Sequence, residues 1–181
     1  MTVPAQSSAI HPLDEFYRRQ SRPLPAYGVI PADAVPEPYR SLLVHERDMT
    51  RTLEQFHAAP IHLRVLSRHR DAGAYCRESV LELDGSNRPV EFGAIRIHLD
   101  RFPEPGRTQI LEEHRPLGGI LNASERRYTS RPTAYLQFTA DDFIAQALGI
   151  SLPACLYGRQ NTLRDAGGGI LAEIIEILPS V

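Results

Sequence analysis

The 181-residue sequence contains no lysine, so all 20 of its basic residues are arginines. Without lysine, Schiff-base catalysis by a lysine side chain and a lysine-anchored pyridoxal cofactor are both excluded. Guanidinium groups are therefore the only permanently charged side-chain cations. They bind carboxylates through paired hydrogen bonds.

Other absences exclude whole classes of protein. The two cysteines, Cys76 and Cys155, provide no disulfide framework, and with the seven histidines they form no metal-ligand spacing, so no metal is expected. No apolar run reaches the roughly 18–20 residues that span a bilayer, and the N-terminus has no secretory signal. The formal net charge is −2 and the arginines are scattered, which is unlike a nucleic-acid-binding surface. We expect a cytoplasmic protein, monomeric or a small homo-oligomer, with no membrane insertion.

The composition divides the chain at about residue 38. Residues 1–38 are rich in proline and poor in pattern, and they are interpreted as an N-terminal extension, either an extended arm over the domain or a partly disordered segment. Residues 39–181 then form a single domain.

Within that domain, short apolar patterns alternate between strand and helix. Strands are predicted over 61–70, 74–85 and 88–102, and a hairpin of two long strands over 155–179; helices are predicted within 38–60, 115–124 and 139–149. Asp48 and Thr139 are predicted helix N-caps, and Gly149 a helix end. Paired strands with helices between the pairs predict an antiparallel α+β domain.

Two predicted strands place charged residues on faces that should be buried. Side chains in a strand alternate between faces, so Arg77 lies on the more apolar face of its strand. Such an arginine either forms an ion pair with a buried carboxylate such as Glu173 or binds a substrate carboxylate. In the last strand, Glu173 and Glu176 are three residues apart and face opposite ways, so one of them should point inward.

Four segments resemble bacterial chorismate pyruvate-lyases, which make 4-hydroxybenzoate and pyruvate from chorismate. They are "LLVHERDMTRTLEQF", "YCRESVLELDG", "RPLGGIL" and "LYGRQNTLRDAGGGILAEIIEILP", which occur in family order and span roughly residues 41–179. The resemblance implies an antiparallel sheet of about six strands, helices packed over one face, and an enclosed ligand cavity beneath them. It also implies a reaction without cofactor.

The same resemblance implies roles for four residues, and the chemistry suggests a fifth. Arg77 and the amide of Leu117 would hold the ring carboxylate of chorismate, while Glu173 and the amide of Met49 would lie near the ring hydroxyl. Arg159 is a candidate second carboxylate ligand, or else a surface arginine at the start of a strand. Glu173 could orient the hydroxyl or accept a proton, although an internal hydrogen transfer needs no base.

Two other functions remain open. Related folds occur as effector-binding domains of transcription regulators, so the protein could bind an aromatic acid without catalysis. Residues 1–38 are too proline-rich to make a helix-turn-helix, which favours the enzyme. A lyase-like homologue could also act on another cyclohexadienyl or aromatic acid, and a product 4-hydroxybenzoate could serve ubiquinone or other biosynthesis.

Overall fold

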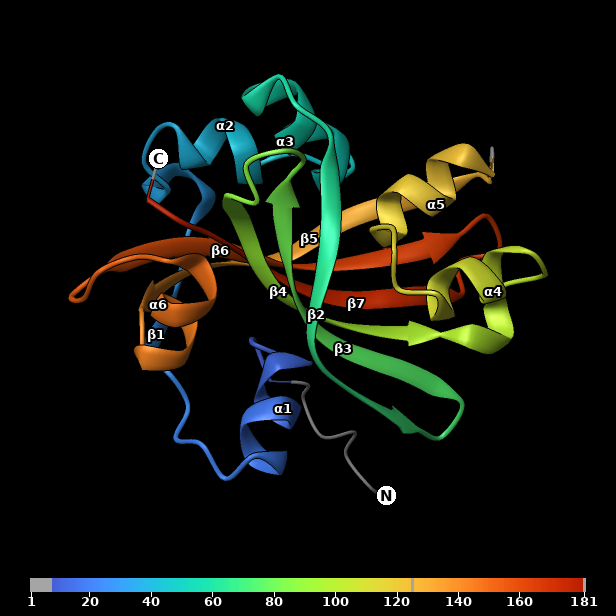
Figure 1. The fold of residues 1–181 in the computed structure, drawn as a ribbon, viewed down its shortest axis with the longest axis horizontal. Coiled ribbons are helices and arrows are strands. Elements are labelled where there is room, and N and C mark those ends of the chain that lie inside the picture. The colour runs from blue at the N-terminus through green and yellow to red at the C-terminus, as the bar shows by residue number, and fades with distance from the viewer. Residues whose placement is uncertain (1–7, 125, 181) are drawn as a thin grey trace.

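A computed structural model describes residues 8–124 and 126–180 of the chain. Its centre is one antiparallel sheet in which seven strands follow the order β1-β5-β6-β7-β4-β3-β2 (Figure 1). The strands are β1 (Tyr27–Ile30), β2 (Ile61–Asp71), β3 (Ala74–Leu83), β4 (Pro89–His98), β5 (Tyr128–Thr139), β6 (Cys155–Asp165) and β7 (Ile170–Leu178).

Six short helices surround the sheet. They are α1 (Leu13–Arg19), α2 (Tyr39–Leu43), α3 (Met49–His57), α4 (Gly106–Leu111), α5 (Leu117–Ala123) and α6 (Asp142–Leu148). Among the described residues, no helix is long and apolar enough to cross a membrane.

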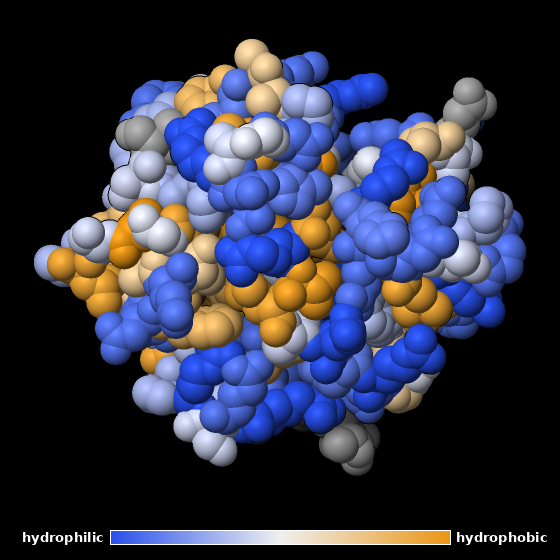
Figure 2. All heavy atoms as spheres, in the orientation of Figure 1, coloured by the Kyte–Doolittle hydropathy of each residue, from blue (hydrophilic) through white to orange (hydrophobic). Residues whose placement is uncertain are grey.

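The helices cover both faces of the sheet, because alternate side chains of each central strand bury apolar surface on opposite sides. Val80 and Ala94 pack with α1 and α6 on one face. Leu81 packs with α2 and α3 on the other face, and Ile95 packs there with α4 and α5. In Figure 1, α1 and α6 accordingly lie apart from the group α2 to α5. The face shown in Figure 2 is mainly hydrophilic, with hydrophobic residues visible between the helices.

The antiparallel α+β architecture is as predicted, and the expected number of about six strands is close to the seven observed. The prediction that helices pack over one face is wrong, because α1 and α6 cover the second face. The sequence analysis missed β5, whose interior contains Pro132. That proline lies at a shift in register between Pro132 and Ala134, one of the few places where a strand tolerates the missing amide donor.

The N-terminal region is more structured than an extended arm. Leu13, Phe16 and Tyr17 of α1 are almost completely buried against the sheet. The β1 strand pairs with β5 and so forms an edge of the same sheet. The extended-arm prediction is therefore wrong for these segments, while its first seven residues lie outside the described part of the chain.

Capping residues define the ends of α3 and α6. Asp48 caps α3, as predicted, by accepting a hydrogen bond from the Arg51 amide at 2.9 Å. In α6 the N-cap is Asp141 rather than Thr139, and it accepts from the Ile144 amide at 2.8 Å. Gly149 ends α6 in the left-handed conformation (φ 65°), as predicted.

Candidate functional site

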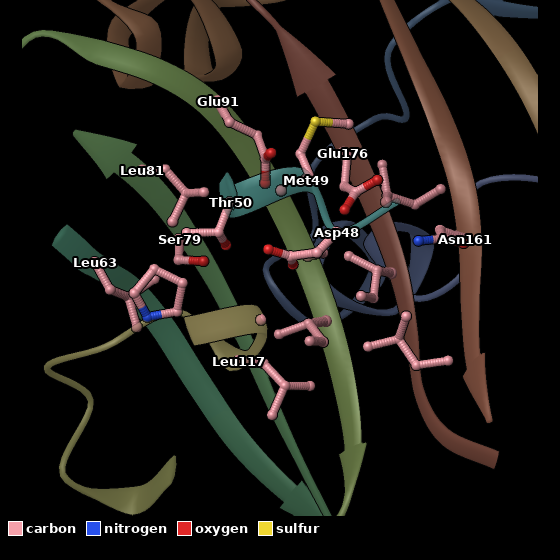
Figure 3. A pocket seen from close by; sticks show the side chains of 18 of the residues that line it. Asp48, Met49, Thr50, Leu63, Ser79, Leu81, Glu91, Leu117, Asn161 and Glu176 are labelled. Atoms are coloured by element: carbon pink, nitrogen blue, oxygen red, sulfur yellow. The ribbon is translucent and has the colours of Figure 1, made fainter. Parts of the chain in front are cut away.

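A pocket lies between the sheet and the N-terminal ends of α3 and α5. Its floor comes from the central strands, including Ser79 of β3, Gly93 of β4 and Glu176 of β7. Its roof comes from Met49 and Leu117, the first residues of α3 and α5 (Figure 3). The pocket therefore joins segments that are far apart in the sequence.

The two roof helices are fixed to each other at Asp48. Its carboxylate accepts a hydrogen bond from the Asn122 side chain of α5 at 3.2 Å, besides capping α3. Gly118 lies so close that a Cβ atom there would be 1.9 Å from an Asp48 carboxylate oxygen. Glycine is thus required in the Pro-Leu-Gly segment because any side chain would push α5 away from α3.

Arg77 is a buried cation on the wall of this pocket. Its exposed fraction is 2%, and burial lowers the pKa of its guanidinium. No carboxylate of the described residues lies within 4.0 Å of it, its Nε has no hydrogen-bond partner, and its one hydrogen bond is a long 3.4 Å contact to the Ile110 carbonyl. The ion pair with Glu173, one of the two roles expected for Arg77, is therefore wrong. The charge of Glu113, which accepts a hydrogen bond from Tyr75, favours the guanidinium, but no carboxylate contacts it directly.

Glu176, rather than Glu173, faces the pocket. Glu176 is 4% exposed and lines the cavity, whereas the Glu173 side chain is 25% exposed and lies on the opposite face of the sheet, 3.8 Å from His11 and 3.6 Å from His98. The placement of Glu173 beside Arg77 is therefore wrong. At this position Glu173 does not reach the pocket, so it cannot take the role near the ring hydroxyl that the resemblance implied.

Arg159 is neither a surface residue nor a free carboxylate ligand. Its side chain is fully buried and forms an ion pair with Glu176. The same guanidinium donates to the backbone carbonyls of Leu43 at 3.1 Å and His45 at 2.9 Å. Because these contacts occupy its donors, Arg159 holds the α2–α3 segment to the sheet and leaves Arg77 as the one cation lining the pocket within the described chain.

Glu91 is a second buried carboxyl group of the pocket. It is 8% exposed, and its Oε2 atom has no hydrogen-bond partner. Burial and the nearby charge of Glu176 raise the pKa of Glu91 well above its ordinary value. Both effects favour the protonated, neutral form of the Glu91 carboxyl group.

Asn161 adds an unpaired acceptor on the far side of the floor. Its amide nitrogen donates to the Ser130 hydroxyl at 2.9 Å, but its buried Oδ1 atom has no donor. Together with Glu91, it gives the pocket two buried polar groups that nothing in the described chain satisfies. Unpaired buried atoms also occur elsewhere in the described chain, and in this pocket the Arg77 Nε atom is a third. A polar ligand bound in the pocket would satisfy the unpaired atoms that line it.

The sequence analysis predicted part of this site. Arg77, Leu117 and Met49 do line one pocket, as the resemblance implied. Glu91 and Asn161 were missed. A signal existed for Glu91, because it alternates in phase with the apolar residues Ile95 and Ile97 of the same strand. Asp48 was recognised only as a helix cap.

The cavity volume is about 60 Å³. That is less than half of the roughly 150 Å³ of a cavity known to hold benzene. An aromatic acid can enter only if side chains or the α3–α5 roof move. Full enclosure of a ligand stays a prediction.

Outside the pocket, a cluster on the α1 face has the composition of a metal site. Ligand atoms of Glu15, His69 and Cys76 lie within 4.8 Å of one another. Arg96 already supplies a positive charge there, with its guanidinium 3.4 Å from Glu15 and 3.8 Å from the Cys76 sulfur. A cation bound there would be repelled by the nearby guanidinium of Arg96. That the protein needs no metal stays a prediction.

His45, which borders Arg159, predicts a loss of stability in acid. Burial, with the charges of Arg159 and Arg47, lowers the pKa of His45 to about 4 from 6.5. Between these pH values the unfolded chain binds a proton that the folded protein does not, so the stability falls as the pH drops from 6.5 towards 4. The variant His45→Gln should lose less stability than the parent between pH 7 and 4.5, measured by urea denaturation. The control His114→Gln, at an exposed position, should lose as much as the parent, and an equal loss in all three proteins would contradict the assignment.

Comparisons with known proteins identify fold relatives only. No family model matches the sequence, and no curated protein matches it. The structure resembles PhnF from Mycobacterium smegmatis with a TM-score of 0.58 and 12% identity, over 76% of this chain and 65% of that chain. It also resembles the effector domain of that PhnF (TM-score 0.55, 12% identity, 74% and 88% of the two chains) and the possible transcriptional regulator YydK from Bacillus subtilis (TM-score 0.51, 8% identity, 66% and 58%).

At these identities the likeness concerns the fold alone. It supports the chorismate lyase-like fold that the sequence resemblance implied, and it does not extend to the chorismate pyruvate-lyase family itself. The chain spans 65% of the length of the PhnF chain, so activities of that whole protein do not carry over directly.

Proposed function

We propose that this protein is a non-catalytic binding module for a small organic acid. The observation that carries the proposal is Arg77, a 2% exposed guanidinium on the pocket wall with no carboxylate within 4.0 Å among the described residues. A buried charge without a partner costs folding free energy. A ligand carboxylate bound in two parallel hydrogen bonds would remove that cost and use the free Nε donor.

The likeness to an effector domain supports binding over catalysis. The chain shares its fold with the part of PhnF that is named as an effector domain rather than as an enzyme. The lyase mechanism that the resemblance implies would use Glu173 as its base, and Glu173 lies on the opposite face of the sheet. Glu176 takes that place near the cavity, and its charge is engaged by Arg159.

Lyase activity is the second candidate, favoured by one observation. Arg77, Leu117 and Met49 line the pocket together, which is the arrangement that the resemblance to chorismate pyruvate-lyases implies. Elimination of pyruvate from chorismate forms an aromatic ring and needs mainly binding and orientation, so a displaced glutamate does not exclude it.

A single experiment separates the two functions. The protein is incubated with chorismate while 4-hydroxybenzoate and pyruvate are measured, and binding of chorismate and 4-hydroxybenzoate is followed by calorimetry. We expect Arg77-dependent binding of an aromatic acid with no pyruvate above the uncatalysed rate. Pyruvate release that scales with protein concentration and disappears in Arg77→Ala would establish the lyase instead.

A further inference from the structure

The pocket has two chemically different ends. Arg77 supplies a positive charge at one end. At the other, the carboxyl groups of Asp48, Glu91 and Glu176 approach from three different segments, and Figure 3 shows them directed at the same cavity. Arg159 balances only one of these three carboxyl groups.

The position of Glu91 follows from the sheet register. Gly93 pairs with Glu176 on β7 and with Ser79 on β3. A Cβ atom on Gly93 would lie 3.5 Å from a Glu91 carboxyl oxygen and 2.5 Å from the Ile175 carbonyl, so Glu91 folds back over a floor that no side chain can fill. Its carboxyl group is thereby held next to that of Glu176.

The unpaired atom at this end requires a ligand that donates hydrogen bonds. Glu91 is 92% buried with a partnerless Oε2, and the carboxyl groups of Asp48 and Glu176 line the cavity beside it. A protonated amine has three donors and no acceptor, and it also carries the charge that surplus carboxylates attract. A hydroxyl group has one donor and no charge, so it satisfies less of this set.

We propose that the end formed by Glu91, Glu176 and Asp48 binds a protonated nitrogen, so that the ligand is a zwitterion whose carboxylate meets Arg77. This inference rests on the proposed binding function and narrows its ligand class. The register places Arg77 and Gly93 one strand and two residues apart, so their backbones are about 8 Å from each other along the floor. Zwitterions whose two charges are separated by a ring or a chain, such as 4-(aminomethyl)benzoate, are therefore suitable probes.

The pH dependence of ligand affinity is a second property expected of this site. The groups facing Glu91 are Glu176 from β7, Arg159 from β6 and Asp48 ahead of α3. Burial and the charge of Glu176 raise the pKa of Glu91, so a proton and a cationic ligand compete for its carboxyl group. Affinity for the amine should therefore rise with pH, and binding should release a proton.

The test compares matched pairs of acids by calorimetry at pH 6 and 8. The pairs are 4-(aminomethyl)benzoate with 4-(hydroxymethyl)benzoate, and 6-aminohexanoate with 6-hydroxyhexanoate. In at least one pair the amine should bind about 10- to 100-fold more tightly than the alcohol, since a charged hydrogen bond contributes about 1.5–3 kcal/mol. Glu91→Gln should abolish this preference and the proton release while the alcohol still binds. The control Glu173→Gln, on the opposite face of the sheet, should keep both.

The possible results test the zwitterionic ligand and the proposed binding function separately. If the acids bind and require Arg77, but alcohols bind as tightly as amines, the zwitterion is wrong and the binding module stands. If no acid of either pair binds the parent protein, both the zwitterionic ligand and the proposed binding function are wrong. A preference for the amine that persists in Glu91→Gln would also overturn the role of Glu91.

Discussion

Replacing Arg77 with methionine is expected to stabilise the ligand-free protein while it abolishes the binding of organic acids. Methionine retains the apolar volume of the side chain and removes a desolvated charge that no carboxylate of the described residues contacts directly. Replacing buried ionic groups by apolar ones often stabilises a protein by about 1–4 kcal/mol, so a gain of at least about 1 kcal/mol is expected. Loss of the charged contact should weaken ligand binding by about 2–5 kcal/mol.

Opposite changes in stability and binding separate a ligand-binding arginine from a structural one. Urea denaturation gives the free energy of unfolding, and calorimetry with a bound acid gives the affinity. Arg77→Lys should bind poorly because an ammonium group cannot reproduce the paired hydrogen bonds of a guanidinium. Arg131→Met, at an arginine whose side chain is 79% exposed, serves as the control and should change neither quantity appreciably. A destabilised Arg77→Met would mean that the arginine supports the fold.

Replacing Arg159 with methionine is expected to have the opposite effect on stability. This change leaves the Glu176 carboxylate buried without its partner and removes the donor to the carbonyls of Leu43 and His45. Breaking one side of a buried ion pair typically costs about 3–5 kcal/mol, which is a large part of the stability of a small domain. The variant should therefore unfold at a much lower urea concentration, or fail to accumulate as a folded protein.

A double variant keeps this second prediction testable if Arg159→Met does not fold. Arg159→Met combined with Glu176→Leu removes both charges, so it should recover much of the lost stability. Glu173→Gln provides the comparison on the same strand, where the carboxylate is partly exposed, and it should cost less than about 1 kcal/mol. Equal losses for Glu173→Gln and Arg159→Met would contradict the assignment of Glu176 as the enclosed carboxylate.

Local patterns in the sequence were sufficient for most of the core domain. The alternation of apolar residues identified β2, β3, β4 and the β6–β7 hairpin, and it placed Arg77 on the inner face. Capping chemistry located α3 at Asp48 and the end of α6 at Gly149. These features depend on neighbours within a few residues, so the sequence carries them directly.

The helix and the strand of the N-terminal segment, α1 and β1, could not be predicted from such patterns. The α1 helix is only seven residues long, and β1 has four residues, most of them exposed. Elements this short have weak intrinsic preferences, and they form because the rest of the domain offers them a surface or an edge. Tertiary contacts, rather than local propensity, therefore determine both of them.

The sequence by itself determined that one glutamate of the last strand would face the interior, but the tertiary structure decided which. Side chains alternate with a period of two, so a one-residue irregularity reverses every assignment that is counted along the chain. Such a shift occurs where β6 and β7 pair, between Leu163 and Arg164. Glu176 then lies opposite Gly93, which leaves space, and opposite Arg159, which supplies the compensating charge. A buried carboxylate needs both, and neither can be recognised before the strands are paired.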